Sequence, residues 1–480
     1  MLQFRPKSRT VVLPVAIFLA ALALATLAAT PAQDIQAARA AADPMLTRNP
    51  GGWLQTYTAS GTIDRDNPFF AALGSNGRSC ESCHQQSQGW TISAAGVQRR
   101  FQRSAGLDPI FRLVDGAVSP LADVSTLEAR RRAYAMLLKY GDLRIGIPMP
   151  ANAEFHLSAV DDPYGYASAA ELSLFRRPLP ATNLIWDTAV MWDGRETFAP
   201  FQPPMDAGID REVLNASLAS QARDAILGHE QAGALPDADI ITRIVDFERS
   251  LFTAQIIDDA AGPLNAGNGM GGAAILAQQR FWIGINDTFG NDPVGEAFDA
   301  QAMRLFDGWN RQHPWQRRSR RGEARAAIAR GQALFNTLPI DISGVAGLND
   351  VTGQSVIHGH CSSCHNAPNI GNHSVGAPLD IGIADASRRT PDLPLYTLTR
   401  NTTGEVVQTT DPGLALLTGK WADIGKVKGP ILRGLAARAP YFHNGSAATL
   451  TDVVDFYDDR FHIGMSQAQK QDLVAFLSAL

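Results

Sequence analysis

The four cysteines constrain this 480-residue chain more than any other feature, because they form two copies of one pentapeptide, Cys-x-x-Cys-His. The residues of the two copies are Cys80, Cys83 and His84 in the first, and Cys361, Cys364 and His365 in the second. This pattern is typical of c-type haem attachment. The two thiols add across the haem vinyl groups as thioethers, and the histidine becomes the proximal iron ligand. The sequence therefore predicts two covalently bound haem c groups and no disulfide.

Two other uses of paired cysteines fit this sequence less well. A four-cysteine zinc ribbon needs its pairs close together, whereas Cys83 and Cys361 are far apart in the chain and each pair is followed by a histidine. A thioredoxin-like redox pair needs a βαβ context, and the pattern around neither pair indicates one. Haem attachment is thus the strongest inference that the sequence allows.

The N-terminal residues have the layout of an export signal. Basic residues precede an apolar run over 11–29, and small residues then offer a cleavage site before Gln33. We predict a signal peptide over 1–32 and a mature protein in the bacterial periplasm, with no membrane segment after cleavage. The alternative is an uncleaved anchor, because the apolar run is just long enough to span a bilayer. The formal net charge of −5 argues against a nucleic-acid partner, since nucleic-acid-binding proteins are usually basic.

Helix signals dominate the rest of the chain, and no long alternating stretch indicates a strand. An apolar face at helical spacing follows Pro236, with Asp237 or Asp239 as its N-cap. Two further amphipathic helices begin after the caps Thr449 and Ser466. We therefore predict a mainly α chain with long loops. The expected segments are a linker over 33–52, an N-terminal haem domain over 53–255, an insertion or linker over 256–320 and a C-terminal haem domain over 321–480.

Beyond the two motifs, the chain resembles the bacterial di-haem cytochrome c peroxidase superfamily, which also includes the di-haem enzymes that mature methylamine dehydrogenase. The resemblance is carried by Trp192-Asp-Gly-Arg195 with the preceding segment 176–183, by Leu218–Ala222, and by the segment 432–445. It implies two cytochrome-c-like helical domains with long loops and insertions, each domain wrapped around one haem. It also implies a peroxidase whose first haem binds hydrogen peroxide and whose second haem accepts electrons from a small cytochrome c or cupredoxin. A homodimer is compatible with it.

The resemblance assigns roles to particular residues near the first haem. Trp192 matches the tryptophan that lies between the haems and relays charge. Gln221 matches a glutamine of the distal-side helix, and the family's distal glutamate falls close to Glu230 and His229. Either of these two side chains would serve as the shuttle that moves a proton from one peroxide oxygen to the other.

The sixth ligand of the second haem stays open between three residues. Fourteen residues after His443 the family places either methionine or tyrosine, and here the residue is Tyr457. Met465 competes with it, and His443 is the third candidate, because the related di-haem rubber oxygenases use a similar position. A tyrosinate ligand would lower the haem potential, whereas methionine would raise it.

Two features depart from the family pattern. No histidine occurs between His84 and His156, so the first haem either stays open or is reached by His156 or Met149. Arg177 stands at the position of the family's calcium-binding asparagine, and Arg438 falls at a neighbouring carbonyl position. Because two arginines would repel a dication, the sequence argues against calcium.

The leading hypothesis from the sequence is a periplasmic di-haem peroxidase that reduces hydrogen peroxide to water. The extra chain, mostly within 95–175 and 256–320, also fits a di-haem oxidase or oxygenase that acts on a protein or an organic substrate. A third hypothesis is a non-enzymatic electron carrier with both irons six-coordinate. A high-spin haem that responds to peroxide would exclude the carrier.

Overall fold

The fold is described from a computed structural model of the chain. The residues described are 43–187, 189–198, 211–279, 303–311, 318–365 and 378–480. The predicted signal peptide and half of the predicted linker lie outside these ranges, so both stay predictions. Within the described ranges, no helix is both long enough and apolar enough to cross a membrane.

The prediction of a mainly α chain is wrong, because helices make up 36% of the structure and strands 18%. The α-helices are α2 (Ala94–Ser104), α3 (Leu127–Ala133), α4 (Ala135–Tyr140), α5 (Arg211–Gly228), α6 (Ala238–Ser250), α7 (Ala273–Leu276), α9 (Arg320–Thr337), α10 (Asn349–Thr352), α11 (Cys361–Cys364), α12 (Ala415–Thr418), α13 (Leu450–Phe461) and α14 (Gln467–Ser478). The strands are β1 (Leu46–Asn49), β2 (Gly52–Tyr57), β3 (Leu143–Ile147), β4 (Phe155–Asp161), β5 (Leu172–Arg176), β6 (Phe252–Asp258), β7 (Gly262–Pro263), β8 (Ile340–Ser343), β9 (Val356–Gly359), β10 (Leu395–Arg400) and β11 (Val406–Thr409). Strands of two to seven residues are too short for periodicity to reveal.

The strands of the described residues form antiparallel sheets that connect distant parts of the chain. One sheet has the order β1-β2-β6-β7 and another the order β11-β10-β4, while β3–β5 and β8–β9 are two-stranded. Buried and half-buried residues alternate along β2, as expected for a strand with one face on the core. In the second sheet, β4 pairs with β10, and Asp161 lies opposite Leu395. The stretch 95–175 is thereby joined to the C-terminal half of the chain.

Three predicted helices are confirmed, two of them together with their side-chain caps. α6 follows Asp237. The Asp452 N–H donates to Thr449 Oγ1 at 3.2 Å at the start of α13, and the Gln469 N–H donates to Ser466 Oγ at 3.3 Å at the start of α14. Both are capping boxes, which satisfy N–H groups that the first helical turn leaves without partners. These helix starts depend on local sequence alone.

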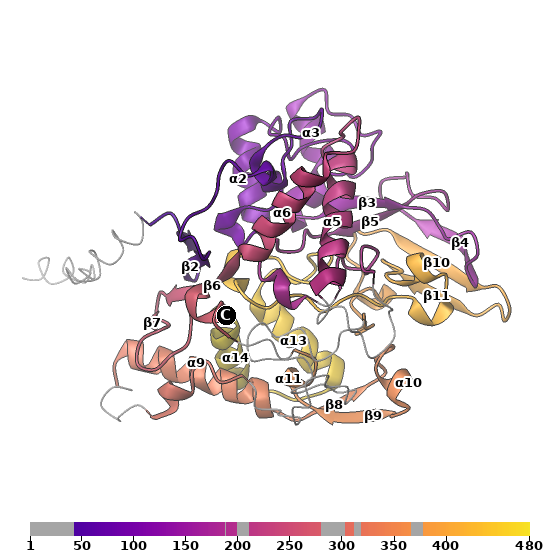
Figure 1. Cartoon of the computed structure of the whole chain (residues 1–480). Helices are drawn as coiled ribbons and strands as arrows, with labels where there is room; N and C mark the ends of the chain where they lie inside the picture. Colours follow the sequence, from indigo (N-terminus) through magenta and orange to yellow (C-terminus); the bar gives the residue numbers. More distant parts are fainter. Residues whose placement is uncertain (1–42, 188, 199–210, 280–302, 312–317, 366–377) are drawn as a thin grey trace, which may run out of the picture. The chain divides into compact units, whose positions relative to one another are not determined.

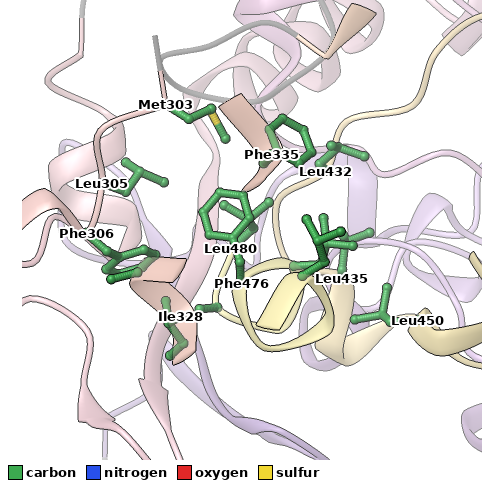
Figure 2. Packing of buried hydrophobic residues seen from close by; sticks show 14 of the residues in the cluster. Met303, Leu305, Phe306, Ile328, Phe335, Leu432, Leu435, Leu450, Phe476 and Leu480 are labelled. Carbon is green, nitrogen blue, oxygen red and sulfur yellow. The ribbon is translucent and has the colours of Figure 1, made fainter. Parts of the chain in front are cut away.

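The hydrophobic core of the C-terminal half lies around α9 and α14, which pack side by side (Figure 1). The rings of Phe335 on α9 and Phe476 on α14 are 5.5 Å apart between centroids. Leu480 packs in the same cluster (Figure 2), and its carbonyl accepts a hydrogen bond of 3.1 Å from the Gln255 N–H of β6. Cys361 packs against this cluster, so the second motif has an apolar wall.

A second core cluster joins α5 and α6 to the first motif. Phe69, Trp90 and Phe247 form an aromatic group, with centroid separations of 5.9 Å for Phe69–Trp90 and 5.8 Å for Trp90–Phe247. Cys80 packs against this cluster, and the His84 ring lies 6.3 Å from that of Phe69. The first motif therefore also has an apolar wall.

Candidate haem-binding sites

The first motif is held in one turn of 3₁₀ helix over Cys80–Ser82. The His84 N–H donates to the Cys80 carbonyl at 3.0 Å, which folds the histidine back towards the cysteines. A hydrogen bond of 3.0 Å joins His84 Nδ1 to the Trp90 carbonyl. Because a carbonyl can only accept, Nδ1 carries the proton, and Nε2 is left as the ring atom that can bind iron.

The protonation state of His84 suits an iron ligand. Burial, with a smaller contribution from the nearby His229, lowers the pKa of His84 to about 4. The ring is therefore neutral at physiological pH, and the lone pair on Nε2 is available to a metal.

The four thiols are weak acids in this fold. Burial raises the pKa of Cys83 to about 11 and the pKa values of Cys361 and Cys364 to about 12, and it also raises the pKa of Cys80. Zinc ligands and redox-active cysteines need the thiolate. None of the four cysteines is paired in a disulfide. This environment disfavours zinc and dithiol chemistry and suits thioether attachment in an apolar pocket.

Glu230 lies against the first motif. Its Oε1 is 3.8 Å from Cys80 Sγ, and its Oε2 accepts a hydrogen bond of 2.8 Å from the Leu73 N–H. The chain before the motif packs closely here, since a Cβ on Gly74 would lie 1.9 Å from the Glu230 carbonyl oxygen. Burial raises the pKa of Glu230 to about 7, so this carboxyl can give or take a proton near neutral pH.

His229 belongs to a buried charged network that the sequence did not reveal. Its Nδ1 donates to Asp115, and Asp115 also binds Arg78 at 2.6 Å. Asp115 and Arg78 are at most 3% exposed. A carboxylate on Nδ1 sets the tautomer and the orientation of the His229 ring. No sequence signal marked Asp115, because it lies in the 95–175 stretch that the family resemblance does not cover.

A second buried carboxyl, Glu248 on α6, also lies near the first motif. Glu248 is 5% exposed, and its charge contributes to the raised pKa of Cys80. Burial raises the pKa of Glu248 to about 8, so the group is mostly protonated at neutral pH. In the sequence Glu248 is only one polar residue of an amphipathic helix, which gave no reason to expect its burial.

Three other residues considered from the sequence lie elsewhere. Gln221 is half-buried on α5, about two turns before the helix ends. His156 is exposed on β4 and bonds to Asn401 Oδ1 at 2.8 Å. Met149 packs in the apolar cluster beside the same strand. The structure therefore brings neither His156 nor Met149 to the first motif.

The second motif borders a cavity of about 220 Å³. Its cysteines lie on the single turn of α11, where the His365 N–H donates to the Cys361 carbonyl at 3.0 Å, as in the first motif. Apolar side chains of α9, β8, α13 and α14 contribute to the remaining wall, together with residues of the loops between elements. Trp192, from the N-terminal half, lines the same cavity.

All three candidates for the sixth ligand line this cavity. Tyr457 is the best placed, because its hydroxyl lies 3.5 Å from Nε2 of His365, the ring atom that would bind iron. Met465 is buried in the neighbouring cluster, where its N–H donates to Asp458 Oδ1 at 2.9 Å. His443 packs edge-on to Trp192, with ring centroids 6.0 Å apart. The geometry thus favours Tyr457 over the two alternatives.

Trp192 is buried, and a hydrogen bond of its indole N–H orients the ring. Its Nε1 donates to the Arg177 carbonyl at 2.7 Å. The next residue, Asp193, pairs with Arg176, and Arg176 binds Asp411 through two hydrogen bonds of 2.7 and 2.8 Å. Asp411 follows β11, so these contacts join the Trp192 segment to the C-terminal half. The predicted relay through Trp192 stays a prediction.

The residues at both motifs fit covalently bound haem. Each motif offers two thiols and a histidine on one turn of helix, next to an apolar wall. The residues that would hold the two groups are Cys80, Cys83 and His84 at the first motif, and Cys361, Cys364 and His365 at the second. Arg177 and Arg438 adjoin each other, and within the described residues no group of three His, Cys, Asp or Glu side chains is arranged to hold a metal ion.

No family model matches the sequence, but curated relatives match part of it. A cytochrome-c peroxidase named IdrP2 from Denitromonas iodatirespirans is 35% identical over 133 residues, which are 25% of this chain and 36% of that protein. One named IdrP1 from Pseudomonas sp. (strain SCT) is 32% identical over 171 residues, which are 32% of this chain and 39% of that protein. This chain therefore spans less than half the length of the relatives it matches.

Among solved structures, a MauG-like protein associated with microbial copper homeostasis aligns at 15% identity with a TM-score of 0.34, covering 87% of this chain and 88% of that chain. A structural alignment with a TM-score of 0.34 does not establish a shared fold. The partial sequence matches to cytochrome-c peroxidases agree with the family resemblance that the sequence motifs indicated. Over part of its length, the chain is thus similar to the di-haem cytochrome c peroxidase superfamily.

Proposed function

We propose that this protein is a periplasmic di-haem c-type peroxidase that reduces hydrogen peroxide to water. In the reaction, one H₂O₂, two protons and two electrons give two water molecules. A small cytochrome c or cupredoxin supplies the electrons one at a time. The names of the matched relatives support a peroxide substrate and a cytochrome donor in general terms. Export by the predicted signal peptide and covalent attachment of two haems are parts of the same proposal.

The observation that carries the proposal is the placement of the Glu230 carboxyl and the His229 ring beside the first motif. Haem bound there supplies the iron that binds peroxide and receives electrons. The chain's own contribution is to take a proton from one peroxide oxygen and return it to the other, which then departs as water. Glu230, with a pKa of about 7, and His229, oriented by Asp115, are both suited to this task.

The proposal is tested with the exported full-length protein carrying its haems. A reduced small cytochrome c is mixed with the protein and hydrogen peroxide, and oxidation of the cytochrome is followed by absorbance. We expect two cytochrome molecules to be oxidised for each peroxide consumed. If neither a cytochrome nor a cupredoxin is oxidised, the proposed function is wrong.

Replacing Tyr457 by methionine is expected to raise the reduction potential of the second haem, because a thioether favours reduced iron and a phenolate favours oxidised iron. The measurement is a spectroscopic redox titration of the holoprotein. Met465→Leu is the matched control, because Met465 lines the same cavity. In this variant the reduction potential of the second haem is expected to equal that of the wild type. The reverse pattern would identify Met465 as the ligand.

A di-haem oxidase or oxygenase that acts on a protein or an organic substrate is the second candidate. The Tyr457 hydroxyl, 3.5 Å from His365 Nε2, favours it, because a tyrosinate ligand stabilises higher oxidation states of iron. In this case donor oxidation would be slow, while peroxide would drive a covalent change in an added protein or organic compound. Mass spectrometry of that compound separates the two functions.

A further inference from the structure

The side chain of Arg177 connects segments that are far apart in the sequence. Its Nη2 donates to the Ile92 carbonyl at 2.6 Å and to the Arg438 carbonyl at 2.8 Å, and its Nη1 donates to the Tyr140 carbonyl. Arg177 is only 5% exposed. Hydrogen bonds from a charged donor are strong when they are formed away from water, so this guanidinium joins three segments firmly.

The backbone of Arg177 holds two aromatic rings. Its N–H donates to the His443 carbonyl at 2.7 Å, and its carbonyl accepts from Trp192 Nε1, also at 2.7 Å. The rings of Trp192 and His443 pack against each other and line the cavity of the second motif. The position of Arg177 therefore determines where Trp192 lies relative to this cavity.

The chain that follows Arg177 leads back to the first motif. Residues 177–181 run beside Trp90, whose carbonyl accepts hydrogen bonds from the Ala181 N–H at 2.9 Å and from His84 Nδ1 at 3.0 Å. A continuous path of covalent and hydrogen bonds thus runs from His84 through Trp90 and 177–181 to Trp192. Any displacement of the 177–181 segment would change both ends of that path.

The Arg177 guanidinium keeps its positive charge at physiological pH although it is buried. Burial lowers the pKa of Arg177 to about 10, against an opposing contribution from the buried Asp142 carboxyl, so the side chain is charged at physiological pH. A Cβ on Gly141 would lie 2.4 Å from Nη1 of Arg177, and Gly141 has a φ of +69°. Both observations require glycine at this position. The site is shaped around the guanidinium itself.

We propose that Arg177 is a positioning residue for electron transfer, and that its guanidinium is a built-in cation that joins three segments and thereby holds Trp192 in place between the two motifs. The inference rests on the proposed function, because it takes Trp192 to be the route of the electrons. It requires no divalent cation for this positioning, since the guanidinium already binds the three carbonyls.

The test uses the full-length holoprotein and the variants Arg177→Met and Arg177→Lys. Methionine keeps an apolar stem but has no charge and no donors, and lysine keeps the charge but not the planar fork. Two quantities are measured without peroxide. One is the rate of electron transfer from the second haem to the first after rapid reduction. The other is hydrogen exchange at the Ala94 amide, which bonds to the Ala439 carbonyl next to Arg438 at 3.2 Å.

Arg389→Met is the matched control. Arg389 also donates to two backbone carbonyls, that of the nearby Leu393 at 2.7 Å and that of the distant Asp161 at 3.0 Å, and it pairs with the Asp161 carboxylate beside the β4–β10 sheet. Its loss would loosen a similar connection without touching the path between His84 and Trp192. Both measured quantities are therefore expected to equal those of the wild type.

We expect Arg177→Met to slow the electron transfer about 10²-fold, as a small misplacement of a reacting group can do. Exchange of the Ala94 amide is expected to become about tenfold faster. Arg177→Lys is expected to lie between Arg177→Met and the wild type, and EDTA is expected to leave the wild type unchanged. If Arg177→Met does not fold, Arg177→Lys decides by the same two measurements.

Two results would overturn the inference. The first is a folded Arg177 variant that transfers electrons between its haems at the same rate as the wild type. The second is a wild-type protein that loses this electron transfer when EDTA is added. A wild type that transfers electrons between its haems but does not reduce peroxide would instead count against the proposed function. The two failures are therefore distinguishable.

Discussion

The Glu230→Gln variant is expected to reduce hydrogen peroxide with a kcat/KM about 10²-fold below that of the wild type, or lower. Glutamine keeps the shape of the side chain and still accepts the hydrogen bond from the Leu73 N–H, but it cannot take up a proton. Stopped-flow mixing with peroxide measures the effect. Both haems are expected to stay bound, because Glu230 supplies neither a thioether nor an iron ligand.

Glu81→Gln is the matched control for this experiment. Glu81 stands between the two cysteines of the first motif, yet its side chain points to the surface, where it pairs with Arg65 at 2.7 Å. Exposed ion pairs contribute little, so kcat/KM is expected to stay within about twofold of the wild type. Normal turnover in Glu230→Gln, combined with a large loss in His229→Gln, would transfer the proton-shuttle role to His229.

The pH profile of peroxide reduction is expected to show the titration of Glu230. Burial raises the pKa of this carboxyl to about 7, so the carboxylate that accepts a proton prevails only above that pH. For the wild type, kcat/KM therefore falls as the pH drops through about 7, by about tenfold per unit at lower pH. Glu230→Gln is expected to lack this inflection. If the inflection persists in Glu230→Gln, it belongs to another group, such as Glu248, whose pKa burial raises to about 8.

Replacing Cys361 and Cys364 together by alanine is expected to leave one covalent haem per chain in place of two and to abolish electron delivery through the second site. The cavity of about 220 Å³ would then lack the group that fills it. At roughly 24 cal/mol per Å³, an empty cavity of this size lowers the free energy of unfolding by at most about 5 kcal/mol, because the walls relax. Haem is counted from the pyridine haemochrome absorbance per chain, and stability is measured by chemical denaturation.

Ser362→Ala controls for disturbance of the motif itself. Ser362 lies between the same two cysteines on α11 but supplies no thioether, so this variant is expected to keep both haems. If the double cysteine variant still carried two haems after extraction under denaturing conditions, covalent attachment at the second motif would be wrong.

Sequence patterns were sufficient wherever the deciding contacts are local. The two Cys-x-x-Cys-His motifs and the capping boxes at Thr449 and Ser466 each lie within a few residues; the structure shows the motifs as single turns of helix and the boxes at the starts of α13 and α14. The strands were missed because each is short, and because several are stabilised by a partner far along the chain, as when β4 pairs with β10. A chain-local pattern carries no information about such a partner.

The amino-acid sequence by itself determined the chemistry that this protein can hold, namely four thiols and two histidines in haem-attachment spacing, and its resemblance to di-haem cytochrome c peroxidases. Only the tertiary structure decided which other groups join them. It brings Asp115 to His229, sets Tyr457 opposite His365, and gathers three carbonyls around Arg177. The physical reason is that these contacts span distant parts of the chain, and burial, which packing alone creates, sets the pKa of Glu230.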